Sequence, residues 1–122
     1  MSKDSILKSK SKEFALHIIH LYNYLYGHKE FVLSKQVLRS GTSIGANITE
    51  AFYAQSTPDF LSKLGIARKE AGETIYWIEL LQEAQYIECS EAESLLNECH
   101  ELLRMLSSSI LTLKQKLSQN NP

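Results

Sequence analysis

Phe60-Leu-Ser-Lys-Leu-Gly-Ile-Ala-Arg-Lys-Glu-Ala-Gly-Glu-Thr-Ile-Tyr-Trp-Ile-Glu-Leu-Leu81 is the stretch that decides the fold class of this 122-residue chain. Its apolar and small side chains recur at alternating spacings of four and three residues, at Phe60, Leu64, Ala67, Ala71, Thr74, Ile78 and Leu81. This heptad seam is typical of a helix that packs lengthwise against other helices. Just upstream, Thr57 can cap the helix, Pro58 suits its first position, and Asp59 suits the positive end of its dipole. The stretch predicts a long helix in an all-α fold.

Two segments before this helix show the same helical period. The first runs from about Lys3 to Tyr26, and we expect Gly27 to end it at the C′ position. The second begins between residue 29 and Ser34, with Ser34 as its N-cap, and ends near Gln55.

A last helix is predicted to begin at Ser90, where Ser90 and Glu93 form a capping box, and its apolar stripe extends to Leu117. The connections between the four segments are short, which favours antiparallel neighbours. We therefore predict an up-down-up-down antiparallel four-helix bundle, all-α, as a single domain over residues 1–122 with an ordered core at about 3–118.

Composition is ordinary for a globular protein, with 43% hydrophobic residues and a net charge of −1. The N-terminus shows no apolar signal-peptide region, and no apolar run reaches the length of a membrane span. We expect a cytoplasmic protein, in which Cys89 and Cys99 stay reduced and structural.

Catalytic and metal-binding patterns are missing from the sequence. A di-iron bundle needs Glu-x-x-His on two helices, whereas Glu70-x-x-Glu73 lacks the histidine, and His17 and His20 have no matching set of carboxylates. The serines at 107–109 have no partnered base for nucleophilic catalysis. We predict no catalytic residues, no metal and no cofactor, and we do not expect an enzyme.

The segment Arg39-Ser-Gly-Thr-Ser-Ile-Gly-Ala-Asn-Ile-Thr-Glu-Ala51 is unusual for a helix because glycine weakens isolated helices. Gly41 and Gly45 share one face, which lets another backbone approach closely. A hairpin about residues 56–58 would place the polar side chains beside the next helix. We expect a mostly buried polar network with a structural role, made of Asn47, Glu50, Arg68 and Glu73.

This segment resembles the four-helix-bundle family named for proteins encoded in intervening sequences of bacterial 23S rRNA genes. The resemblance continues through Asp59-Phe60, Lys63-Leu-Gly-Ile-Ala-Arg-Lys-Glu70, Glu73-Thr-Ile-Tyr-Trp-Ile78 and Leu80-Leu81. It implies a homopentameric ring and a relation to the accessory protein of diversity-generating retroelements. That relative has a basic surface and works with a reverse transcriptase and RNA, whereas this chain is near neutral overall.

Two surfaces are candidates for partners. Extra apolar side chains on residues 60–81 predict a subunit interface at Tyr76, Trp77 and Leu80. Charge is polarised along the predicted bundle: residues 1–14, 54–64 and 110–122 carry a net +4, while residues 26–35 and 79–101 carry −6. We expect the basic end to attract a polyanion through Lys8, Lys10, Lys12 and Lys116.

The residues alone leave two function classes open. One is an oligomeric scaffold that binds RNA or a nucleic-acid-processing protein. The alternative is a homo-oligomer with a purely protein partner and no nucleic-acid binding. Neither class involves a membrane.

Overall fold

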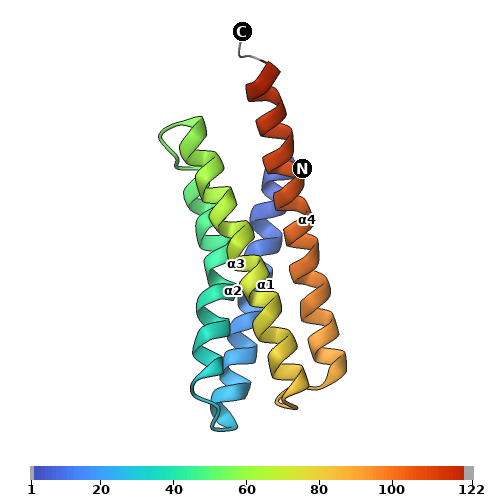
Figure 1. The fold of residues 1–122 in the computed structure, drawn as a ribbon. Helices are drawn as coiled ribbons and strands as arrows, with labels where there is room; N and C mark the ends of the chain where they lie inside the picture. The colour runs from blue at the N-terminus through green and yellow to red at the C-terminus, as the bar shows by residue number, and fades with distance from the viewer. Residues whose placement is uncertain (1, 120–122) are drawn as a thin grey trace.

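The computed structural model describes residues 2–119, which fold into an up-and-down bundle of four helices (Figure 1). Their bounds are α1 (Lys3–Gly27), α2 (Leu33–Ala51), α3 (Thr57–Glu83) and α4 (Cys89–Gln119). Each helix packs against the next one in sequence, and α4 also packs against α1. The predicted all-α four-helix bundle is confirmed. Met1 and residues 120–122 of the predicted domain lie outside the described part.

The core follows the heptad seam of α3 closely. Leu64, Ala67, Ala71, Thr74, Ile78 and Leu81 are all buried, and only the first seam residue, Phe60, is partly exposed. On α4 the buried stripe ends at Ile110, whereas Leu113 is half-buried and Leu117 is 36% exposed. The periodic pattern therefore continues beyond the point where the other helices cover α4.

Helix α1 ends differently from the expectation, because Gly27 is its last helical residue and does not adopt a left-handed conformation. Lys29 takes that conformation instead, with φ 65°. The Glu30 N–H donates to the Leu25 carbonyl at 2.9 Å and the Lys29 N–H to the Tyr26 carbonyl at 3.0 Å, the two bonds of a Schellman motif. A lysine can occupy this position because the two hydrogen bonds offset the free-energy cost of the left-handed backbone conformation.

The start of α2 is capped by Glu30 and not by the expected Ser34. The Glu30 carboxylate accepts hydrogen bonds from the backbone N–H groups of Val32 (3.2 Å), Leu33 (2.9 Å) and Ser34 (2.6 Å). Burial alone would raise the pKa of this carboxyl, but the three N–H groups outweigh that effect and hold the pKa below its ordinary value. Ser34 lies inside the helix, where its side chain is buried.

The remaining boundaries differ from the predictions by one to four residues. Ser56, not Thr57, caps α3, and its hydroxyl accepts from the Asp59 N–H at 3.2 Å. Helix α4 begins at Cys89, one residue before the expected Ser90, and α2 ends at Ala51 rather than near residue 55.

The small face of α2 allows the close approach that the glycines predicted, and the neighbour is α1 of the same chain. A Cβ at position 41 would lie 2.8 Å from the Ile18 side chain, and one at position 45 would lie 3.3 Å from the Ser11 hydroxyl. Both Gly41 and Gly45 are therefore used in packing α2 against α1.

Candidate nucleic-acid interface

The start of α1, the α2–α3 connection and the end of α4 lie at one end of the bundle (Figure 1). This arrangement follows from the alternating direction of the four helices. It brings together lysines that are far apart in the sequence, and we refer to this region as the lysine end. By their positions in α1, α3 and α4, its members are Lys3, Lys8, Lys12, Lys63, Lys114 and Lys116.

The lysines of this end are held in different ways. The Lys8 ammonium lies 4.1 Å from the centroid of the Phe52 ring, which is a cation–π contact. The Lys3 ammonium donates to the Ser108 hydroxyl at 3.1 Å. Lys12 is exposed on the outside of α1.

Lys10, one of the four predicted nucleic-acid contacts, forms an ion pair with Glu101 of α4 at 2.8 Å. The hydrogen bond to Glu101, followed by its negative charge, raises the pKa of the Lys10 ammonium above its ordinary value. The charge of Lys10 is therefore already compensated within the bundle, although the count from the sequence includes it as a free positive charge of the lysine end.

The Lys10–Glu101 ion pair and the His17–Glu98 contact correct the charge count made from the sequence. Glu101 lies beside Lys10, and Glu98 accepts from His17 at 2.8 Å, so both glutamates sit along the side of the bundle and not at its far end. Without them the far end carries −4 instead of −6, and pairing of Lys10 leaves +3 instead of +4 at the lysine end. The polarity is weaker than predicted but has the same direction.

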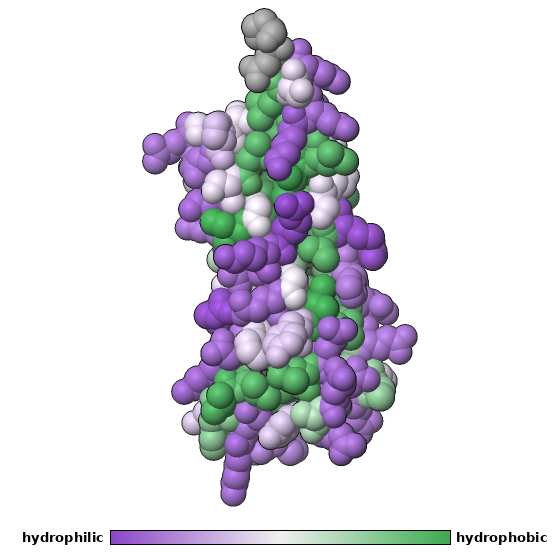
Figure 2. Space-filling model, in the orientation of Figure 1, coloured by the Kyte–Doolittle hydropathy of each residue, from purple (hydrophilic) through white to green (hydrophobic). Residues whose placement is uncertain are grey.

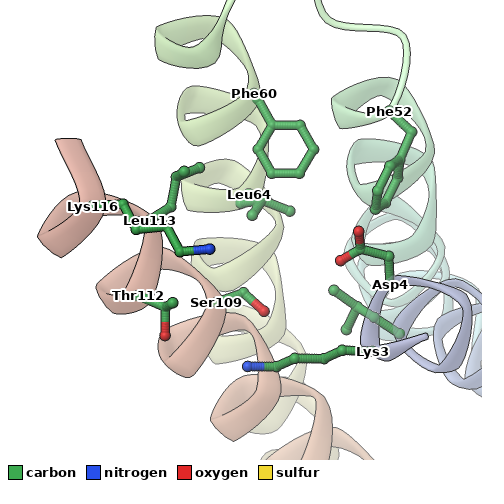
Figure 3. A pocket seen from close by; sticks show the side chains of 10 residues that line it. Lys3, Asp4, Phe52, Phe60, Leu64, Ser109, Thr112, Leu113 and Lys116 are labelled. Carbon is green, nitrogen blue, oxygen red and sulfur yellow. The ribbon is translucent and has the colours of Figure 1, made fainter. Parts of the chain in front are cut away.

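A cavity of about 310 Å³ opens at the lysine end between all four helices (Figure 3). Its apolar wall is made by Leu7, Phe52, Phe60, Leu64 and Leu113, and its polar lining by Lys3, Asp4, Ser109, Thr112 and Lys116. The sequence signal for this cavity is the continuation of the apolar stripe of α4 past Ile110, because Leu113 borders the cavity and is not part of the buried core.

The predicted network of Asn47, Glu50 and Arg68 does not form within residues 2–119. Glu50 and Arg68 are both exposed, and the Asn47 amide donates to the Ser43 carbonyl of its own helix at 2.8 Å. Residues two apart on a helix point roughly 160° away from each other. Arg68 therefore faces away from the side of α3 on which Glu70 meets α2.

Arg39 of α2, and not Arg68, is the arginine that pairs with carboxylates between α2 and α3. Its guanidinium binds Glu70 at 3.2 Å and also binds Glu73, which was predicted to join Asn47, Glu50 and Arg68 but pairs with Arg39 instead. Glu73 in turn accepts the indole N–H of Trp77 at 2.9 Å. This cluster ties α2 to α3 on the outside of the bundle, where Arg39 is about half exposed.

The predicted interface residues lie near the opposite end of α3. Tyr76 is 56% exposed, while Trp77 and Leu80 are half-buried, and the two aromatic rings meet edge-on at 5.0 Å. Figure 2 shows apolar and pale atoms gathered on the lower part of this face. Since Trp77 already packs on the core and bonds Glu73, Tyr76 is the more accessible of the two aromatic side chains.

Two features are absent from residues 2–119. No group of three or more His, Cys, Asp or Glu side chains is arranged so that it could hold a metal ion. In the same range, no helix is long and apolar enough to cross a membrane. The thiol of Cys99 is buried, which raises its pKa to about 12.

Comparison with known proteins identifies a family model and a solved structure that the chain is similar to. The family model described as 23S rRNA-intervening sequence protein matches residues 3–108. The fold is similar to the crystal structure of a protein of unknown function from the S23 ribosomal protein family of Bacteroides thetaiotaomicron, with a TM-score of 0.88 and 55% identity. That alignment covers 89% of this chain and 98% of the other. Among functionally curated proteins, none matches the chain significantly.

Proposed function

The chain belongs to the 23S rRNA-intervening sequence protein family, and from this premise we propose that it is a non-enzymatic, self-assembling bundle whose lysine end binds RNA. We place its action in the cytoplasm. The observation that carries the proposal is the separation of charge along the bundle, with lysines of three chain segments gathered at one end.

Charge separation matters because RNA is recognised first through its phosphates. An end with a net charge of about +3 faces incoming RNA, and this value already includes Asp4, Glu13 and Asp59. Most of the remaining acidic groups lie at the other end or are paired along the side. Contacts between lysines and phosphates position a nucleic acid without reading its sequence. We therefore expect salt-sensitive binding with little sequence preference.

Self-association strengthens this effect. In a cyclic assembly whose helices run close to the direction of the symmetry axis, all subunits point the same way, so the lysine ends share one face. The surface of Tyr76, Trp77 and Leu80 is the proposed contact between subunits, and a homopentamer is the assembly that we expect. Several weak sites on one face then engage the same RNA and raise its apparent affinity.

The assembly is tested by light scattering of the wild type and of Tyr76→Ala at micromolar concentration. Loss of an aromatic anchor costs about 2–4 kcal/mol of association, so Tyr76→Ala is expected to dissociate at concentrations where the wild type is oligomeric. Tyr53→Ala makes the same change at an exposed site away from the proposed interface, so it is the matched control and should not dissociate. A monomeric wild type contradicts the assembly.

The RNA proposal is tested by filter binding of a structured RNA at two salt concentrations. Replacing Lys8, Lys12 and Lys116 by Gln is expected to weaken binding and to lower the salt slope by about 2, since each lost phosphate contact contributes about 0.7–0.9. Lys10→Gln is the control, because Glu101 already pairs with this side chain. A wild type that binds no RNA at low salt contradicts the proposal and leaves a purely protein partner as the explanation of the lysine end.

A further inference from the structure

The cavity at the lysine end has the features of a nucleotide site, and we propose that it receives the base of an unpaired nucleotide of the bound RNA. This inference rests on the proposed function, because it specifies how RNA meets the lysine end. The preferred ligand is then single-stranded RNA, a preference that charge alone does not produce.

Two phenylalanine rings form an aromatic wall of the cavity. Phe52 at the end of α2 and Phe60 at the start of α3 lie with ring centroids 5.4 Å apart and an angle of 86° between their planes (Figure 3). Each is half-buried, so part of each ring borders the cavity. One face of Phe52 is covered by Lys8, which leaves Phe60 as the better surface for stacking. Bases stack on aromatic side chains whatever their sequence.

The polar lining of the cavity suits a base better than an acyl chain. The carboxylate of Asp4 and the hydroxyls of Ser109 and Thr112 border the same cavity as the two phenylalanines. A hydrocarbon ligand would remove these groups from water without bonding them, which carries a free-energy cost. A base edge offers amino groups to the carboxylate and acceptors to the hydroxyls.

Two cations lie at the rim of the cavity. Lys3 from α1 and Lys116 from α4 approach the cavity from opposite sides (Figure 3). A nucleotide whose base enters the cavity leaves its phosphates outside, within reach of such side chains. Alternation of aromatic and cationic groups is how proteins hold single strands. Tyr53, 84% exposed on the adjoining connection, provides a second aromatic surface for a neighbouring base.

The size of the cavity limits the ligand. At about 310 Å³ it lies at the small end of ligand pockets, which span roughly 300–1,000 Å³. One base fits this range, whereas a base held in a duplex is stacked and paired and must first be extruded. The site therefore selects unpaired nucleotides.

The test compares a 12-nucleotide oligo-adenylate RNA carrying one 2-aminopurine with a duplex of the same length. We expect the single strand to bind more tightly and the fluorescence of 2-aminopurine to change on binding. Phe60→Leu keeps the side chain apolar and preserves the fold, and it is expected to weaken single-strand binding by roughly 5- to 100-fold. The salt slope should remain unchanged, since no phosphate contact is lost.

Two controls separate this inference from the proposed function. Phe31→Leu makes the same change at the far end of the bundle and should bind both RNAs like the wild type. Lys114→Gln removes a lysine of the lysine end that does not line the cavity, so it should weaken single-strand and duplex binding alike. Equal binding of single strand and duplex, or a Phe60→Leu variant that binds like the wild type, overturns the base site while lysine-dependent binding stands. Failure of both RNAs to bind at low salt overturns the proposed function as well.

Discussion

Replacement of Glu30 removes the carboxylate that caps α2 and leaves three backbone N–H groups without their partner. The side chain is only 8% exposed, so water cannot easily take its place. Loss of an N-cap costs about 0.5–2 kcal/mol, and hydrogen bonds to a charged acceptor are worth about 1.5–3 kcal/mol. We expect Glu30→Ala to lower the free energy of unfolding by about 2–4 kcal/mol. Glu30→Gln keeps one carbonyl acceptor and should cost about half as much.

The same group makes stability depend on pH in a defined direction. Its pKa is lowered in the folded protein, so the unfolded chain binds the proton more readily. The contribution of Glu30 is complete above the ordinary pKa of about 4.5 and is lost as the pH falls through the lower folded value. The wild type should therefore lose more stability than Glu30→Gln between about pH 5 and the acid limit of folding.

Urea unfolding followed by circular dichroism measures both effects, with protein concentration held constant because assembly adds to apparent stability. Glu50→Gln is the matched control: Glu50 is exposed, and it should match the wild type within about 0.5 kcal/mol at every pH. The reasoning is refuted by a Glu30→Gln variant as stable as the wild type at pH 7, or by one with the same acid dependence.

Two further contrasts follow from packing and ion pairs. Gly41→Ala should lower the free energy of unfolding by about 1–2 kcal/mol, because the new methyl group would meet Ile18 in the core, while Gly72→Ala, with no atom within 4 Å, should raise it by about 0.5–1 kcal/mol. Arg39→Gln should cost about 0.5–1 kcal/mol and Arg68→Gln nothing measurable, since only the first is paired with α3 carboxylates. Urea titrations of these four variants check both contrasts, and the reverse order within either pair contradicts the packing described.

The fold was predictable because its deciding signals are local and repeated. The heptad seam of α3, together with Pro58 and Asp59 at its start, fixes a long helix with a defined buried face. Short connections then leave few ways to arrange four such helices. The close approach at Gly41 was also predictable, although the sequence could not identify Ile18 of α1 as its neighbour.

The helix ends and polar partners were harder to predict because they depend on tertiary position. Glutamate is not among the preferred N-cap residues, and Glu30 caps α2 only because the turn after α1 points its carboxylate at three N–H groups. Lys29 and Gln85 both take left-handed conformations in which glycine is the usual residue. Whether Arg68 can reach a carboxylate between α2 and α3 depends on how α3 is rotated about its axis. Arg68 and Glu70 point roughly 160° apart, so the rotation that turns Glu70 towards Arg39 turns Arg68 away.

The two ends of the bundle differ in how the core is closed, and this difference supports placing binding at the lysine end. At the far end of the bundle, the α3–α4 connection inserts Ile87, which is 5% exposed, into the core, and Glu30 is buried at the turn between α1 and α2. At the lysine end, Phe52, Phe60 and Leu113 are only half-buried around the cavity. Truncation of Phe52, Phe60 or Leu113 should therefore cost less stability than truncation of Ile87. Leu7 and Leu64 close the core beneath the cavity, so these three half-buried side chains can remain accessible to a ligand beside the lysines.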